Sequence, residues 1–219
     1  MKAAAFLFDL DGTLVDTEHF WAEAIVLWVR SRGGETTLEA ILPRVVGRSW
    51  IDIDHDLHAA FPCLGATTPS EDAVTLRVFY LQVADDPKNM RIESSIAFFH
   101  QVAKIAPCAI VSGSPHDDVV EAARVCGIDA ELKLVLGAGE YVAGKPSPSG
   151  YLKAAELLGA DPANCVVIED SRPGVQSGVA AGMKVIALAR GEMTAADFPG
   201  ATWVVPDLNG FNLKEFQDE

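Results

Sequence analysis

The chain has 219 residues, of which 49% are hydrophobic, and it carries a formal net charge of -14 at pH 7. This apolar content excludes a disordered chain, and the negative charge disfavours nucleic acid and anionic membranes as partners. The length is sufficient for one core with a smaller second domain.

The first predicted element is a short apolar run, residues 4–9, which ends in two carboxylates, Asp9 and Asp11. Such a run predicts a strand buried on both faces, and open parallel sheets bind ligands at the carboxyl ends of their strands. Two acids held there repel each other unless a cation or a shared proton relieves them. An ordinary Asp-Gly turn is the alternative, but a turn needs no paired carboxylates. We therefore favour a functional site.

A helical segment follows. Helical patterns cover residues 17–32, 38–46, 51–61 and 70–84. They predict an all-helical domain of residues 16–88, inserted into a second domain made of residues 1–15 and 89–219. An insert at this point would lie over the carboxyl end of the first strand, as a lid does.

Beyond the insert, short strand-like runs alternate with helical patterns. The runs are residues 107–112, 132–136, 165–170, 184–188 and 202–205. This alternation predicts the α/β class, a parallel sheet with helices on both faces. Ser147 and Ser171 stand just before prolines and are predicted to cap helices. Tyr151 falls on the apolar face of one helix.

Chemically capable residues follow three of these later strands. Ser112 ends the second run, Lys145 lies in the loop after the third, and Glu169-Asp170 end the fourth. Each has a structural alternative: a helix cap for Ser112, a solvated loop lysine, and acids that complement a helix dipole. Their joint placement at successive strand ends favours a divalent-metal and phosphate site.

In this order, the motifs resemble those of the haloacid dehalogenase superfamily over essentially the whole chain. The motifs are Asp9-Leu10-Asp11-Gly12-Thr13, Ser112, Lys145 before a proline, and Glu169-Asp170. The insert is similar to the helical cap of the branch that includes phosphoglycolate phosphatases and beta-phosphoglucomutases. The resemblance implies a Rossmann-like, doubly wound core with a strand order near 5-4-1-2-3 and a mobile cap.

The resemblance also implies roles in catalysis and metal binding. Asp9 would be the nucleophile that forms an aspartyl-phosphate, and Asp11 the general acid and base. Mg²⁺ would be held by Asp9, by the backbone carbonyl of Asp11 and by Asp170, with Glu169 bound directly or through water. Having an acid at position 11 favours phosphate esters, because an alkoxide leaving group benefits from a proton and a halide does not.

Phosphate binding is implied for a further set of residues. Ser112 would donate a hydrogen bond to a phosphoryl oxygen, and Lys145 would offset the negative charge. Backbone amides at Gly12, Thr13 and Gly113 would approach the same phosphate.

Candidate specificity residues in the insert are His19, Trp21, Arg48 and Ser49. Residues 47–49 resemble the specificity loop of helical caps, although a helix-capping turn is an equal alternative. Trp21 shares a helical face with apolar residues, so core packing is favoured, and a surface role is the default for His19.

Together these observations predict a cytoplasmic, Mg²⁺-dependent phosphatase of a small phosphate ester, such as a sugar phosphate or a phosphoglycolate-like compound. The chain has no apolar stretch that suggests a membrane span, no signal-peptide pattern and no closely paired cysteines among its 4. We expect a monomer or small homo-oligomer. The alternatives are a beta-phosphoglucomutase-like phosphoryl transferase and a non-catalytic regulator that binds phosphorylated metabolites.

Overall fold

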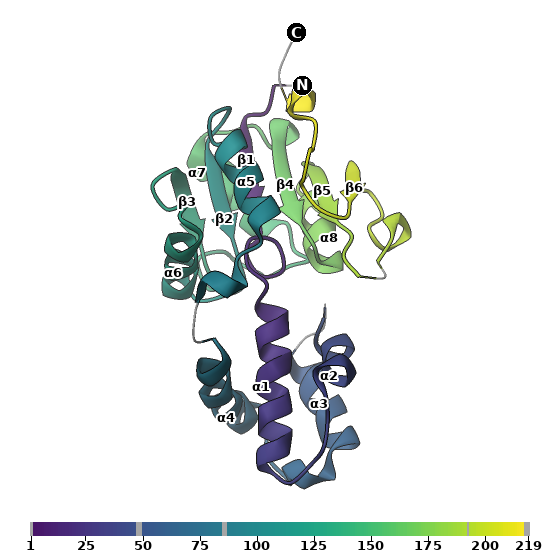
Figure 1. The fold of residues 1–219 in the computed structure, drawn as a ribbon. Helices are drawn as coiled ribbons and strands as arrows, with labels where there is room; N and C mark the ends of the chain where they lie inside the picture. Colours follow the sequence, from purple (N-terminus) through teal and green to yellow (C-terminus); the bar gives the residue numbers. More distant parts are fainter. Residues whose placement is uncertain (1, 47–49, 85–86, 192, 217–219) are drawn as a thin grey trace. The chain divides into compact units, whose positions relative to one another are not determined.

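The computed structural model describes residues 2–46, 50–84, 87–191 and 193–216 (Figure 1). It divides into two compact units. The core unit comprises Met1–Val15 and Arg91–Glu219, and the helical unit comprises Asp16–Met90. None of the described helices is long and apolar enough to cross a lipid bilayer.

A parallel sheet forms the centre of the core unit. Its strands are β1 (Ala5–Phe8), β2 (Cys108–Val111), β3 (Leu132–Leu136), β4 (Cys165–Glu169), β5 (Lys184–Leu188) and β6 (Trp203–Val205). The order is β3-β2-β1-β4-β5-β6, and every neighbouring pair is parallel. The predicted α/β class is confirmed. The order matches the expected one, with β6 added beyond β5.

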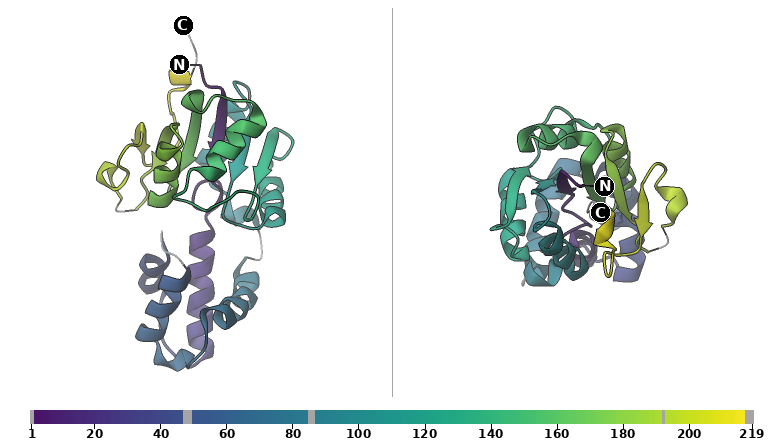
Figure 2. Two further views of the ribbon diagram at one scale, coloured as in Figure 1. Left: turned by 180° about the vertical axis from the view of Figure 1, so that it is seen from behind. Right: turned by 90° about the horizontal axis from the view of Figure 1, so that it is seen from above.

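Helices cover both faces of this sheet. They are α5 (Glu93–Val102), α6 (His116–Cys126), α7 (Ser149–Leu158) and α8 (Arg172–Ala180), with short 3₁₀ turns at Pro162–Asn164, Ala195–Asp197 and Leu213–Phe216. Because side chains alternate along a strand, Phe6 and Phe8 of β1 point to the same face and pack against Phe98 of α5. Helix α5 lies over this face of the sheet (Figure 1). Leu7 belongs to a different cluster, which includes Tyr151 of α7. Helix α7 lies on the opposite face of the sheet from α5, as the view from behind shows (Figure 2). β1 is therefore buried on both faces, which explains its continuous apolar sequence.

One of the two predicted serine caps is present. The Ser171 Oγ accepts a hydrogen bond from the Gly174 N–H at 3.1 Å and caps α8. The prediction for Ser147 is off by one residue: it is not the N-cap of α7, although its Oγ accepts a hydrogen bond from the Ser149 N–H at 3.4 Å. The helix begins at Ser149 and takes Pro148 as its N-cap, one residue too late for a Ser147 cap.

The helical unit contains four α-helices, α1 (Thr17–Ser31), α2 (Leu38–Val45), α3 (Trp50–Ala60) and α4 (Pro69–Val83), and 3₁₀ turns at Pro62–Leu64 and Pro87–Met90. Each α-helix begins and ends within one residue of its predicted pattern. A cluster that includes Ile25, Trp28 and Leu57 forms a separate hydrophobic core for this unit. A reciprocal capping box between Thr68 and Glu71 starts α4.

The chain leaves and re-enters the core unit through two adjacent segments. Val15 and Arg91 form an antiparallel bridge, and the Ile92 N–H donates to the Leu14 carbonyl at 2.9 Å. The next pair along belongs to the helical unit, where the Asp16 N–H donates to the Met90 carbonyl at 2.7 Å.

Candidate active site

The carboxyl edge of the sheet gathers the polar residues that the sequence singled out. Asp9 follows β1, Ser112 follows β2, and Glu169 ends β4 immediately before Asp170. The loop between β3 and α7 brings in Lys145. Because all these strands are parallel, their carboxyl ends lie side by side and residues distant in sequence become neighbours.

Lys145 joins two of the acids. Its ammonium forms ion pairs with Asp9 Oδ1 and with Glu169 Oε1, the latter at 2.6 Å. Asp9 is only 7% exposed and Glu169 is fully buried, so both charges lie largely out of water. Buried charges persist only when they are paired and hydrogen-bonded, and Lys145 supplies the positive partner.

Glu169 receives hydrogen bonds on both oxygens. The Tyr151 hydroxyl donates to Oε1 at 2.8 Å. Oε2 accepts from the Asp170 N–H at 3.2 Å and from the Ser171 N–H and Oγ at 3.2 and 3.0 Å. A Cβ on Gly174 would lie 1.8 Å from Oε1, so this carboxylate requires a glycine there. Glu169 is thus fixed by its surroundings.

Asp170 lies against the loop after β1. The Thr13 hydroxyl donates to Asp170 Oδ1 at 3.2 Å. Gly12 has a φ of +83°, and a Cβ there would lie 1.9 Å from Asp170 Oδ2. Both the backbone conformation and the close approach of the carboxylate therefore require glycine at this position.

Asp11 is held by serine hydroxyls. Its Oδ2 accepts from Ser114 Oγ at 2.8 Å and from Ser112 Oγ at 3.4 Å. Ser112 Oγ in turn accepts from the Ser114 N–H at 3.0 Å, and the Ser112 carbonyl accepts from the Tyr141 hydroxyl at 2.7 Å. At Gly113 an added Cβ would meet no described atom within 4 Å, so the protein itself does not require glycine there.

Comparison with known proteins identifies the family of this chain. Residues 3–182 match the haloacid dehalogenase-like hydrolases. The chain belongs to this family. It is 32% identical over 193 residues to hexitol phosphatase A of Escherichia coli, covering 86% of this chain and 84% of that protein. The predicted family and enzyme class are therefore confirmed.

Solved structures of haloacid dehalogenase-like proteins share the whole fold. A hydrolase of the family from Deinococcus radiodurans, crystallised with bound phosphate and sodium, has a TM-score of 0.76 at 26% identity, covering 97% of this chain and 95% of that one. Beta-phosphoglucomutase from Clostridium difficile has a TM-score of 0.73 at 21% identity, covering 99% and 96%. The second likeness concerns the fold alone.

The acids of this hydrolase create an excess of negative charge. Burial raises the pKa of Asp9 from 3.8 to about 7, Lys145 opposes this rise, and the charges of Glu169 and Asp11 add to it. Burial alone would lower the pKa of Lys145, but Asp9 and Glu169 raise it well above its usual range. One lysine therefore does not neutralise the site, and a bound cation would complete it.

The donor set fits a hard divalent cation. Asp9, Glu169 and Asp170 each offer a carboxylate oxygen, and these atoms lie within 4.8 Å of one another. Mg²⁺ prefers such oxygen ligands and usually keeps several waters. The glycine at position 12 leaves the space next to Asp170 that a side chain would fill.

The two described specificity candidates of the helical unit contact side chains of that same unit. His19 Nε2 lies 3.3 Å from Glu23 Oε1 in a half-exposed pair. Trp21 stacks on Tyr80 with ring centroids 4.1 Å apart and packs on the core of the helical unit, as the helical pattern favoured. Arg48 and Ser49 lie outside the described residues.

Sequence reasoning missed four residues that shape the site of this hydrolase. They are Ser114, Tyr141, Tyr151 and Gly174. A signal existed for Tyr151 alone, because a tyrosine on a buried helix face needs a hydrogen-bond partner for its hydroxyl.

Proposed function

We propose that this hydrolase removes phosphate from a small phosphorylated metabolite, of which a sugar phosphate is the leading candidate, with Mg²⁺ and through an aspartyl-phosphate on Asp9. The observation that carries the proposal is the contrast between two neighbouring acids. Asp9 is paired with an ammonium group, whereas Asp11 is held by two hydroxyls. The likeness to a hexitol phosphatase supports a polyol or sugar phosphate as substrate.

Asp9 would act as the nucleophile. The Lys145 ammonium favours its carboxylate form and orients it at the end of β1. Its oxygen would attack phosphorus and form a new P–O bond, while the bond from phosphorus to the ester oxygen breaks. Lys145 would also offset the charge that accumulates on the phosphoryl oxygens.

Asp11 would move the proton. In its acid form it would protonate the departing alkoxide, and as a carboxylate it would then deprotonate the water that hydrolyses the aspartyl-phosphate. The hydroxyls of Ser112 and Ser114 hold its Oδ2 in place. The Ser112 contact is long, at 3.4 Å, so its hydroxyl can turn to a phosphoryl oxygen at little cost.

Asp9, Asp170 and the backbone carbonyl of Asp11 would hold Mg²⁺. The ion would neutralise charge and polarise a phosphoryl oxygen. Glu169 fits a supporting role better than direct binding, because both of its oxygens already accept hydrogen bonds inside the protein. It would position Lys145 and the backbone of Asp170.

A panel of phosphate esters tests the proposal. The protein is incubated with hexitol phosphates, sugar phosphates including glucose 1-phosphate, and phosphoglycolate, each with Mg²⁺, and free phosphate and sugar isomers are measured. We expect phosphate release that EDTA and Asp9→Asn abolish and that Asp129→Asn, at an exposed site, leaves intact. An isomerised sugar phosphate without phosphate release would favour a mutase, and binding without turnover would indicate a regulator.

A further inference from the structure

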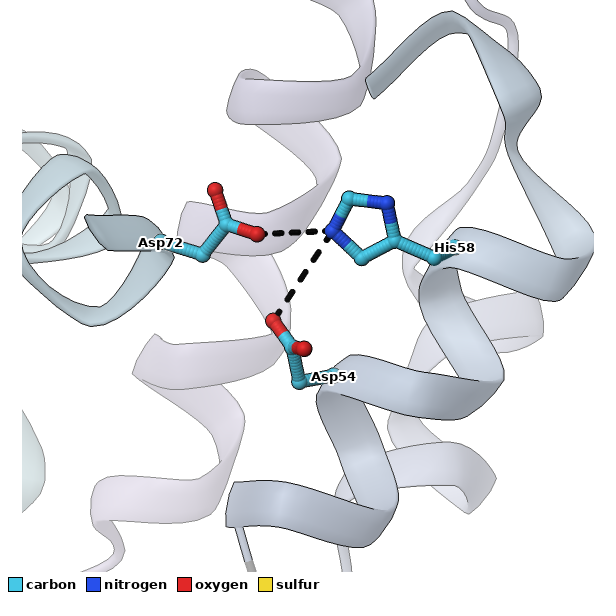
Figure 3. A group of neighbouring side chains, drawn as sticks. All are labelled: Asp54, His58 and Asp72. Carbon is cyan, nitrogen blue, oxygen red and sulfur yellow. Dashed lines mark hydrogen bonds and ion pairs between the residues drawn. The ribbon is translucent and has the colours of Figure 1, made fainter. Parts of the chain in front are cut away.

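The helical unit contains a second cluster of metal-binding side chains (Figure 3). Asp54 and His58 lie one turn apart on α3 and therefore on the same face of that helix. Asp72 comes from the first turn of α4. Each of the three offers one ligand atom, and these atoms lie within 4.8 Å of one another.

The hydrogen bonds of His58 determine where its protons lie. Its Nδ1 is 3.0 Å from the Gly65 carbonyl, which can only accept, so Nδ1 carries a proton. Its Nε2 is 2.6 Å from Asp72 Oδ2, which also accepts from the Thr67 hydroxyl at 2.7 Å. In the neutral imidazole, Nε2 would therefore direct a lone pair at a carboxylate, and the Thr67 hydroxyl lies 3.4 Å from the same nitrogen. A proton or a metal ion shared by Nε2 and Asp72 would relieve this contact.

Asp54 is a second acid of the cluster that lacks a described partner for one of its oxygens. It is 4% exposed, and its Oδ1 has no hydrogen-bond partner among the described residues. Figure 3 shows this oxygen pointing at the His58 ring, 3.9 Å from Nε2. A buried carboxylate oxygen is thus aimed into the cluster, and no described residue donates a hydrogen bond to it.

A second proton on His58 satisfies only one of the two acids. An imidazolium would pair with Asp72 at 2.6 Å, but 3.9 Å leaves Asp54 beyond hydrogen-bonding distance. A tetrahedral ion with ligand bonds of about 2.0–2.2 Å separates its ligand atoms by about 3.4 Å. The two observed distances bracket that value, so side-chain shifts below about 1 Å would let all three residues bind one ion.

We propose that Asp54, His58 and Asp72 bind a divalent transition-metal ion of the zinc class, which ties α3 to the start of α4. One imidazole nitrogen with two carboxylates suits zinc better than magnesium, which prefers oxygen alone. The bond from Nδ1 to a backbone carbonyl is the support that metal-bound histidines usually have. The His58 side chain is 22% exposed, so an ion and a water ligand can reach it.

The site lies wholly within the helical unit and does not depend on the proposed phosphatase mechanism. The bonds from the ion to its three ligands would hold the end of α3 at Ala60 and the start of α4 at Pro69 together, in addition to side-chain packing. Because binding of the ion to the folded form alone raises the free energy of unfolding, the ion would stabilise this unit.

The test uses the 219-residue chain in excess Mg²⁺, which occupies all-oxygen sites. Co²⁺ is added as a spectroscopic probe and Zn²⁺ as the structural ion. We expect one Zn²⁺ per chain by elemental analysis after dialysis, a visible Co²⁺ absorption typical of four-coordinate sites, and a melting temperature raised by Zn²⁺. The Co²⁺ titration of the unmodified protein requires no variant to fold.

Matched variants then locate the ion. Asp54→Asn has nearly the same shape and removes a like charge, so the metal-free protein should keep its melting temperature. Its Zn²⁺ affinity should fall by more than about 100-fold, because even supporting residues contribute about 10–100-fold. His55→Gln, at an exposed position on the same helix, and Asp170→Asn in the core unit should retain Zn²⁺. Absence of Zn²⁺ uptake by the unmodified protein, or unchanged affinity in folded Asp54→Asn, would overturn the proposal.

Discussion

Replacing Gly12 by alanine separates backbone strain from damage to the proposed metal-binding site. Gly12 and Gly139 have almost equal φ angles, +83° and +84°, so an alanine at either position should cost about 1–2 kcal/mol. For a chain of this size, that loss lowers the melting temperature by about 2–8 °C. Only at Gly12 would the new Cβ also meet Asp170, 1.9 Å from Oδ2, whereas at Gly139 nothing lies within 4 Å.

The activities of the two variants should therefore differ although their stabilities are similar. Real Cβ contacts are essentially never under 3.0 Å, so the Asp170 carboxylate must retreat by about 1.1 Å from its distance of 1.9 Å. A displacement of that size lowers kcat/KM by about 100-fold, or about 2.7 kcal/mol. Phosphate release is measured against Mg²⁺ concentration for both variants, and Gly12→Ala alone should need more Mg²⁺. Equal activity in the two variants would refute the assignment of Asp170 to the metal.

Three further predictions concern single groups. Asp11→Asn should lose far more turnover with alkyl phosphates than with p-nitrophenyl phosphate, whose leaving group needs little protonation; equal losses would argue against Asp11 as the acid. Tyr151→Phe removes a donor to the Glu169 carboxylate and should cost about 1.5–3 kcal/mol in denaturant unfolding, and an unchanged midpoint would contradict that contact. Burial raises the pKa of the Cys108 thiol to about 12, so at pH 8 it stays protonated, and alkylation followed by mass spectrometry should find Cys63 modified and Cys108 intact.

Much of the fold could be predicted because its strands are either buried on both faces or bounded by clear turns. The sequence also indicated the meeting of Asp9, Lys145 and Glu169, since parallel strands bring their carboxyl ends to one edge. Contacts set by side-chain direction could not be predicted. Ser114 reaches Asp11 only because of the path of the loop after β2, and nothing local marks that path.

The error at Ser147 has a similar physical origin. A serine before a proline is a sound local signal for a helix start, but the helix began one residue later. Gly174 is another residue whose role could not be predicted from the local sequence. Its need to be glycine comes from a carboxylate on the preceding strand, which only the folded chain places 1.8 Å from the missing Cβ.

The paired segments at Val15 and Arg91 make the helical unit modular. Because the chain departs and returns at neighbouring points, a short turn could replace residues 16–90 without stretching the sheet. Helical units of different length or sequence can be grafted at the same two points. The carboxyl edge of the sheet and the inserted segment could therefore diverge separately in evolution, each keeping its own hydrophobic interior.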